Sequence, residues 1–211
     1  MLGLPKATEL SRQLPKKAIY AKFSMNTAAK DRFDADISRI NIVNEVSPAT
    51  LAIAAGKEVK AFYVLLVLLK RKDYDERLIG QLSRLIEQNM IFVLEYADEA
   101  RLAIYHGKLM QTSWSPKDSL SIALKGLDLD AVWQNIIVQI GEVRIEQGNT
   151  LDEQLAIDEK RAKLQKEIDK LEKLARAEKQ PKKKFELFQK IANLKNEYLE
   201  DEYERFSKVE N

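Results

Sequence analysis

The feature that most restricts the fold is an unbroken apolar run, VKAFYVLLVLL, at residues 59–69, whose only charge is Lys60. A run this short cannot cross a bilayer, which takes roughly 20 apolar residues. Because both of its faces are apolar, both must be covered by other parts of the protein. Its β-branched and aromatic residues favour a central strand over a buried helix. We therefore predict a buried strand at this position, with Leu65 and Leu66 on opposite faces.

Composition excludes several classes of protein. The chain is 45% hydrophobic, which permits a folded core, and its 32% of charged residues indicates long solvated helices. The net charge is only +2, so a nucleic-acid surface would have to be a local patch. The chain has no Cys and a single His, His106, which excludes disulfides, thiolate chemistry and paired-His metal sites. We expect no cofactor and no metal, and, because no leader peptide is visible, a cytoplasmic protein without membrane contact.

Hydrophobic periodicity predicts alternating helices and strands around the apolar run. Pro5 and Pro15 would bound the first helix, and Asn26 or Thr27 would cap the second. The expected helices cover residues 7–13, 28–40, 75–87 and 131–143, the last capped by Asp130, and the expected strands cover residues 49–55, 91–96, 101–105 and 119–124, with a turn at 56–57 into the apolar run. This mixture predicts an α+β domain.

The composition changes after residue 147. From there the chain is rich in Lys, Glu, Leu and Ala, and two apolar stripes follow helical spacing. The stripes comprise Ile157, Leu164, Ile168, Leu171 and Ala175, and then Leu187, Ile191, Leu194 and Tyr198. Pro181 lies between them and would cost about 3 kcal/mol inside one continuous helix. We therefore predict an α+β core with a mixed sheet and flanking helices at 1–147, and a C-terminal antiparallel helical hairpin, a coiled coil, at 148–211.

Glu58 and Lys60 are the only candidates for catalysis. Two residues apart on a strand, they would share one face, as the Glu-x-Lys pair of the restriction-nuclease fold does. In that fold the carboxylate binds magnesium and the lysine activates water, but a further Asp on the preceding strand is needed. The stretch ATLAIAA at 49–55 contains none. The pair also occurs often by chance, so a nuclease, active or degenerate, is the second hypothesis.

A basic cluster near the predicted hairpin tip is the stronger signal. Its members are Lys170, Lys173, Arg176, Lys179, Lys182, Lys183, Lys184 and Lys190. Such a cluster is either an ordinary solvated helix end or a surface for DNA phosphates or an acidic partner. The nearest aromatic residue is Phe185, so base stacking is not expected.

Several stretches resemble one bacterial family, catalogued as domain of unknown function 4391. They are MLGLPKATEL, the second LPK, SPATLAI, IFVLEYADEARLAIY, GLDLDAVWQNIIVQI and EKQPKKKFELFQKIANLKNEY. The resemblance covers nearly the whole chain, and its opening and tail are the more specific parts. It departs at Asn89-Met90, where a proline-containing turn is expected before the strand.

Members of this family are typically encoded beside helicases and DNA methyltransferases of restriction-like, anti-phage systems. The resemblance therefore implies an accessory protein of such a system. It implies no catalytic residues. We therefore expect a non-enzymatic subunit that docks on a helicase or DNA methyltransferase through the hairpin. The expected binding residues are Lys173, Arg176, Lys179, Lys182, Lys183 and Lys184. DNA contact through the basic tip and a homo-oligomer are further hypotheses.

Overall fold

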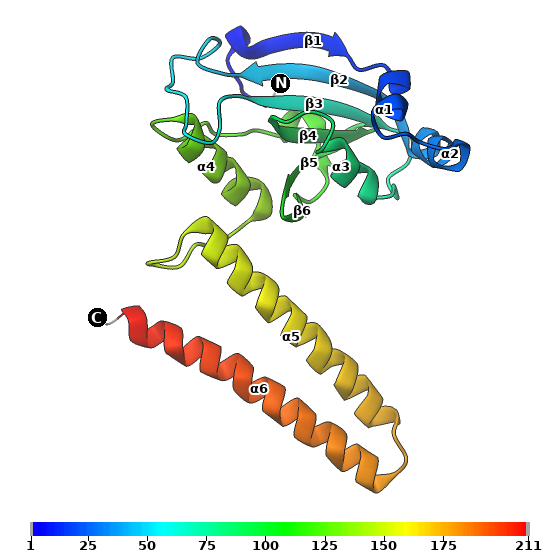
Figure 1. Ribbon diagram of the computed structural model, residues 1–211, viewed down its shortest axis with the longest axis vertical. Helices are drawn as coiled ribbons and strands as arrows, with labels where there is room; N and C mark the ends of the chain where they lie inside the picture. Colours follow the sequence, from blue (N-terminus) through cyan, green and yellow to red (C-terminus); the bar gives the residue numbers. More distant parts are fainter. Residues whose placement is uncertain (1, 210–211) are drawn as a thin grey trace. The chain divides into compact units, whose positions relative to one another are not determined.

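The computed structural model describes the backbone of residues 2–209 and the side chains of residues 2–197. The chain divides into two compact units, Met1–Val143 and Arg144–Asn211 (Figure 1). The first contains a mixed sheet with helices, and the second contains two long helices that pack together. The predicted α+β class is confirmed.

A seven-stranded mixed sheet forms the centre of the first unit. Its strands are β1 Glu9–Gln13, β2 Ile37–Val46, β3 Phe62–Leu69, β4 Asn89–Tyr96, β5 Glu99–His106, β6 Lys108–Gln111 and β7 Ser115–Pro116. Strands β1 to β6 lie in chain order, and β7 pairs with β5. All pairs are antiparallel except β3 and β4, which are parallel and are connected through a helix, as parallel neighbours require.

The apolar run forms the interior strand β3, between β2 and β4. Val64 and Leu65, which point to opposite faces, are both fully buried, so both faces of the strand are covered. The predicted central strand is confirmed. Two details differ: the strand begins at Phe62 rather than at residue 59, and Leu66 is only half-buried.

Four helices cover the two faces of this sheet. On one face lie α1 Lys16–Lys22, α2 Thr27–Asp36 and α3 Arg77–Leu82, which share a core with Leu65. On the other face lies α4 Leu129–Gly141, whose Trp133 ring packs 5.4 Å from the ring of Phe62. Two short 3-10 helices, η1 Lys6–Thr8 and η2 Lys117–Ser119, complete this unit.

The stretch before β3 corrects three predictions. Residues 7–13 form η1 and the exposed edge strand β1 instead of a helix, because their backbone pairs with β2. The predicted helix at 28–40 ends at Asp36, although its Asn26 cap is confirmed by a 2.9 Å hydrogen bond from the Ala29 amide. Residues 49–55 are a loop with one isolated bridge at Ala54 rather than a strand.

A bulge explains the error at the end of the second helix. Ile37 and Ile40 are both buried and lie three residues apart, a spacing that is typical of a helix. In β2 the register with β3 shifts between Ile37 and Arg39. The extra residue of a bulge turns both isoleucines to the core while the backbone remains extended. A helical spacing therefore arises within a strand.

Downstream of β3 the predictions are confirmed only in part. The hairpin of β4 and β5 is confirmed, whereas the predicted helix at 75–87 is reduced to α3, and no strand forms at 119–124. The strand β6 was missed. Helix α4 is capped by Asp128, which accepts a 2.9 Å hydrogen bond from the Ala131 amide, and not by Asp130.

The second unit consists of α5 Leu151–Ala177 and α6 Pro181–Val209. Thr150 and Glu153 form a reciprocal capping box that starts α5. The two helices are antiparallel, since ion pairs join Lys195 to Glu172 at 2.8 Å and Lys160 to Glu197 at 3.7 Å. The core between them contains Ile168, Ala175 and Ile191, with Leu171, Leu187 and Leu194 packed against it. Tyr198, the last residue of the predicted stripe, lies outside the described side chains.

Candidate functional site

Glu58 and Lys60 do not lie on the strand on which the sequence placed them. Both are exposed residues of the loop before β3. The Lys60 ammonium donates a 2.7 Å hydrogen bond to the Gly56 carbonyl, so it is engaged in holding the loop. The Glu58 amide donates to the carboxylate of Asp130. The shared strand face that made this pair resemble a nuclease site is therefore missing.

Asp130 explains why this loop is ordered. Its carboxylate accepts hydrogen bonds from three successive backbone amides, at 2.6 Å from Lys57, 3.2 Å from Glu58 and 2.7 Å from Val59. These bonds, with the Val59 amide as the largest contribution, lower the pKa of Asp130. Successive amides of this kind can bind an external anion, but here a side chain of the protein fills the position. The arrangement anchors the loop to α4.

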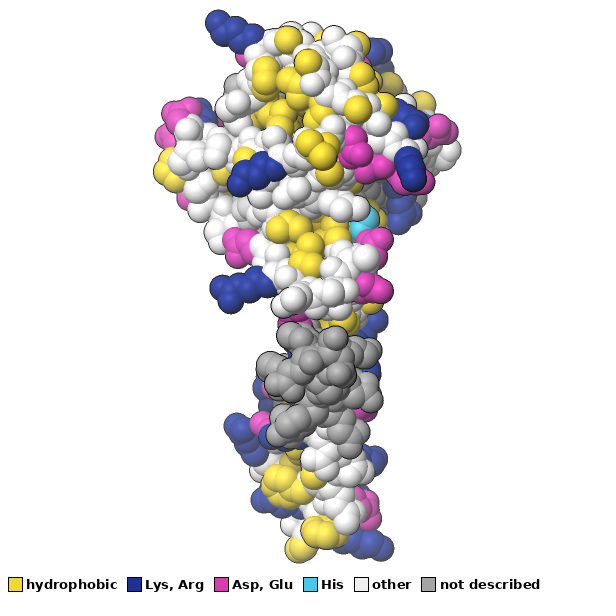
Figure 2. Space-filling model, turned by 90° about the vertical axis from the view of Figure 1, so that its left-hand side faces the viewer, with side chains coloured by type: hydrophobic (Ala, Val, Ile, Leu, Met, Phe, Trp, Pro, Cys, Tyr) yellow, Lys and Arg dark blue, Asp and Glu magenta, His cyan; other side chains and the backbone are white. Residues whose placement is uncertain are grey.

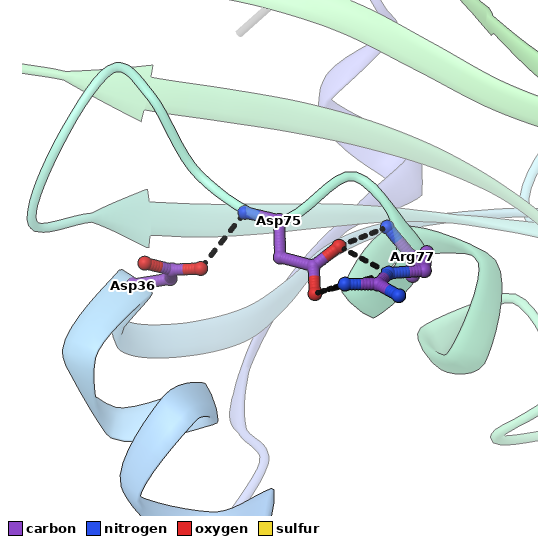
Figure 3. A network of polar contacts seen from close by, with 3 residues as sticks. All are labelled: Asp36, Asp75 and Arg77. Atoms are coloured by element: carbon purple, nitrogen blue, oxygen red, sulfur yellow. Dashed lines mark hydrogen bonds and ion pairs between the residues drawn. The ribbon is translucent and has the colours of Figure 1, made fainter.

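A second polar network joins α2 to the segment between β3 and α3. The buried carboxylate of Asp36 accepts a 2.8 Å hydrogen bond from the Asp75 amide and pairs with Arg71. The Asp75 carboxylate in turn accepts hydrogen bonds from Arg77, from its backbone amide at 3.1 Å and from its guanidinium at 2.9 Å (Figure 3). The Arg77 side chain is the main cause that lowers the pKa of Asp75. Each carboxylate has a cationic or amide partner, so the network holds a connection in place.

Two further findings concern metal binding and membrane spanning. Among the residues whose side chains are described, no group of three or more His, Asp or Glu could hold a metal ion. In the described part of the chain, no helix combines the length and apolar character that crossing a membrane requires.

The hairpin tip, defined here as residues 173–190, gathers the predicted binding residues. Three residues, Glu178 to Gln180, connect the helices, and Pro181 opens α6, a position that suits proline because its missing N–H would have no helical partner. The Glu178 amide closes α5 on the Leu174 carbonyl at 2.9 Å, and the Gln180 amide donates to the Glu178 carboxylate at 2.8 Å. The sharp reversal brings the basic residues of both helices to one end of the unit.

The tip carries an excess of positive charge. It contains seven basic residues, namely Lys173, Arg176, Lys179, Lys182, Lys183, Lys184 and Lys190, and two acidic residues, Glu178 and Glu186, for a net charge of +5. Arg176 pairs with Glu172 at 3.3 Å. Within residues 2–197, no ion pair engages Lys179, Lys182, Lys183, Lys184 or Lys190. These five ammonium groups are therefore available to an external anion or carboxylate.

Apolar side chains lie among these charges. Leu174, Phe185 and Phe188 are 48%, 63% and 49% exposed. Figure 2 shows hydrophobic side chains next to lysines and arginines at the lower end of the view, where the hairpin ends. Large exposed apolar side chains bordered by charged residues mark a candidate surface for binding a partner.

A hollow of about 710 Å³ opens at the tip between the two helices. Leu174 and Ala177 of α5 and Leu187 of α6 supply its apolar part. Charged side chains surround them: Glu178, Lys179, Lys183, Glu186 and Lys190. The lining of the hollow therefore combines apolar side chains with three lysines and two glutamates.

The structure brings together the lysines that the sequence singled out and adds residues that it missed. For two of the missed residues, Phe185 and Phe188, the sequence does contain a signal. They lie outside the helical stripe of Leu187, Ile191 and Leu194 that packs on α5. Aromatic residues off the buried stripe of a helix must face solvent or a partner. No comparable signal marks Leu174, whose exposure depends on where α5 ends.

The molecule is thus an α+β domain followed by a helical hairpin with a basic and apolar tip. A family model described as Domain of unknown function (DUF4391) matches residues 2–197, and the chain belongs to this family. Comparison with curated proteins and with solved structures found no match.

Proposed function

We propose that this protein is a non-enzymatic interaction subunit whose hairpin tip binds a protein partner. The observation that carries the proposal is the group of exposed apolar side chains, Leu174, Phe185 and Phe188, within a basic surface. An ordinary solvated helix end has no need of exposed phenylalanines, whereas large apolar and aromatic residues are typical of the centre of an interface. The resemblance implies the partner class, a helicase or DNA methyltransferase of a restriction-like system.

Co-purification tests the proposal. The tagged protein would be co-expressed with the helicase and the DNA methyltransferase encoded nearest to its gene, and captured partners would be identified by mass spectrometry. The test variant is Phe185→Ser/Phe188→Ser, which removes apolar surface from the tip without touching the helix core. The matched control is Leu127→Ser, because Leu127 is 94% exposed on the first unit.

We expect the wild type and the Leu127→Ser variant to retain the partner, and the double variant to lose most of it. Circular dichroism should be unchanged in all three proteins, because the altered side chains are exposed. Equal capture by the wild type and the double variant would refute the role of the tip.

The lysines give a second, independent test. Changing Lys182, Lys183 and Lys184 together to Glu should leave the helical content intact and weaken capture of the partner. If the triple variant instead loses binding to duplex DNA while partner capture persists, the tip is a nucleic-acid surface and the proposal of a protein partner is wrong. Nuclease activity of Glu58 and Lys60 stays the alternative hypothesis and is tested separately below.

A further inference from the structure

We propose that the occupant of the tip hollow is an acidic amphipathic helix of the partner protein. This inference rests on the proposed function and adds the chemistry of the partner. It follows from three properties of the hollow: its position between two helices, the distribution of charge around it, and the absence of aromatic rings from its lining.

The residues that line the hollow are arranged in a way that suits a third helix. Lys183, Leu187 and Lys190 lie at i, i+4 and i+7 and therefore share one face of α6. Leu174 and Ala177 line the opposite side from α5. A groove between two antiparallel helices is where the side chains of a third helix pack in a helical bundle. Peptide helices bind such grooves through apolar residues at i, i+3 or i+4, and i+7.

The charges select the sign of the partner. Three lysines, Lys179, Lys183 and Lys190, and two glutamates, Glu178 and Glu186, line the hollow, so its lining is net basic within a tip of net charge +5. No ion pair within residues 2–197 engages the three lysines. Carboxylates that flank the apolar stripe of a docking helix would meet these ammonium groups. Complementary charge of this kind raises the association rate and excludes partners of the same sign. A basic helix with the same apolar stripe would be repelled.

Two other occupants fit less well. Single-stranded nucleic acid binds where bases stack on aromatic rings, and the lining of the hollow is aliphatic and charged. A symmetric contact between the tips of two copies would place lysines against lysines, because each partner in such a contact presents the same patch.

The chain does carry one stretch with the chemistry of the proposed occupant. Residues 197–204 read EYLEDEYE, which combines acidic, aromatic and aliphatic residues. A second copy could offer this stretch to the tip, and the experiment must therefore separate it from a foreign helix.

Fluorescence anisotropy with labelled peptides tests the inference on the full-length protein. The probe is a helical peptide of about 20 residues with Leu at i, i+3, i+4 and i+7 and Glu elsewhere on its flanks, long enough to be helical in the complex. A second peptide replaces every Glu by Lys, and a third replaces every Leu by Ser. The test variant is Lys183→Glu/Lys190→Glu. The control, Lys17→Glu/Lys166→Glu, changes the net charge equally at exposed sites outside the tip.

We expect the acidic Leu peptide to bind and the other two to fail. The test variant should bind it roughly ten-fold more weakly, while the control binds as the wild type does. Added salt should weaken the wild-type complex. Equal binding of the Lys peptide, or equal binding by the test variant, would overturn the inference.

The remaining outcomes separate the two proposals. If no peptide binds but the partner is still captured through Phe185 and Phe188, the proposed function stands and the acidic-helix inference fails. If neither occurs, both fail. If sedimentation shows a dimer of the wild type that the test variant abolishes, the occupant is a second copy, and the inference of a foreign helix is wrong.

Discussion

Truncation of Leu65 tests the central strand of the first unit. Leu65 is fully buried between β2 and β4, opposite Ile42 on one side and Phe92 on the other. The core around Leu65 also includes buried residues of α1, α2 and α3. These neighbours leave little room for the structure to relax around a missing side chain. Leu65→Ala removes buried methyl groups and leaves a cavity, so it should lower the free energy of unfolding by about 2–5 kcal/mol. With a urea slope of about 2 kcal/mol per molar, the midpoint falls by about 1–2.5 M.

Tryptophan fluorescence in urea is the appropriate assay. The chain has two tryptophans, Trp114 and Trp133, and both belong to the first unit. Trp133 packs against Phe62 at the start of β3, so its emission reports on the sheet and not on the hairpin. The unfolding of the first unit can thus be followed in the intact protein.

The neighbouring residue supplies the matched control. Leu66 lies on the same strand but is only half-buried. Leu66→Ala should therefore cost clearly less than Leu65→Ala. The reasoning is refuted if Leu65→Ala stays within the ±0.5 kcal/mol range of surface substitutions, or if Leu66→Ala costs as much.

Three further predictions concern the rest of the first unit. The purified protein should not cleave DNA or RNA with magnesium; cleavage that disappears in both Glu58→Gln and Lys60→Ala would establish the nuclease instead. Gly56→Ala should destabilise by about 1–3 kcal/mol, because a Cβ atom there would lie 2.1 Å from an α4 carboxylate oxygen; an unchanged thermal midpoint would contradict this. Finally, the pKa of Asp34 lies below its usual 3.8, and the hydrogen bond from Lys16 is the main cause. The ionised Asp34 therefore stabilises the folded protein above pH 3.8, and this stabilisation is lost as the pH falls through the folded-state pKa. Between about pH 5 and pH 3, urea midpoints should fall more for the wild type than for Asp34→Asn, and parallel curves would exclude this contribution.

Elements with a strong local signal could be predicted from the sequence. The run at 62–69 is apolar on both faces and is the interior strand, and the polar turn between β4 and β5 marks their hairpin. Pro181 divides the tail into two helices because proline interrupts helical hydrogen bonding. In each case the information lies within a few residues, so neighbours in the sequence are sufficient.

Elements that depend on distant partners could not be predicted. All five residues of β1 are exposed, so no hydrophobic alternation marks them, and only pairing with β2 makes the segment a strand. The apolar stretch at 49–55 has the composition of a strand but lacks a neighbouring strand to satisfy its backbone. Strand formation is decided by hydrogen bonds between segments, which local composition does not contain.

At the hairpin tip, too, some features follow from the sequence and others follow only from the tertiary structure. The sequence by itself determined the basic cluster, the two apolar stripes and the break at Pro181, because charge and periodicity are properties of the chain. Only the tertiary structure decided that Leu174, Ala177 and Leu187 line one hollow together with three lysines and two glutamates. A groove exists only between two surfaces, and its lining depends on how the helices are paired and where each one ends.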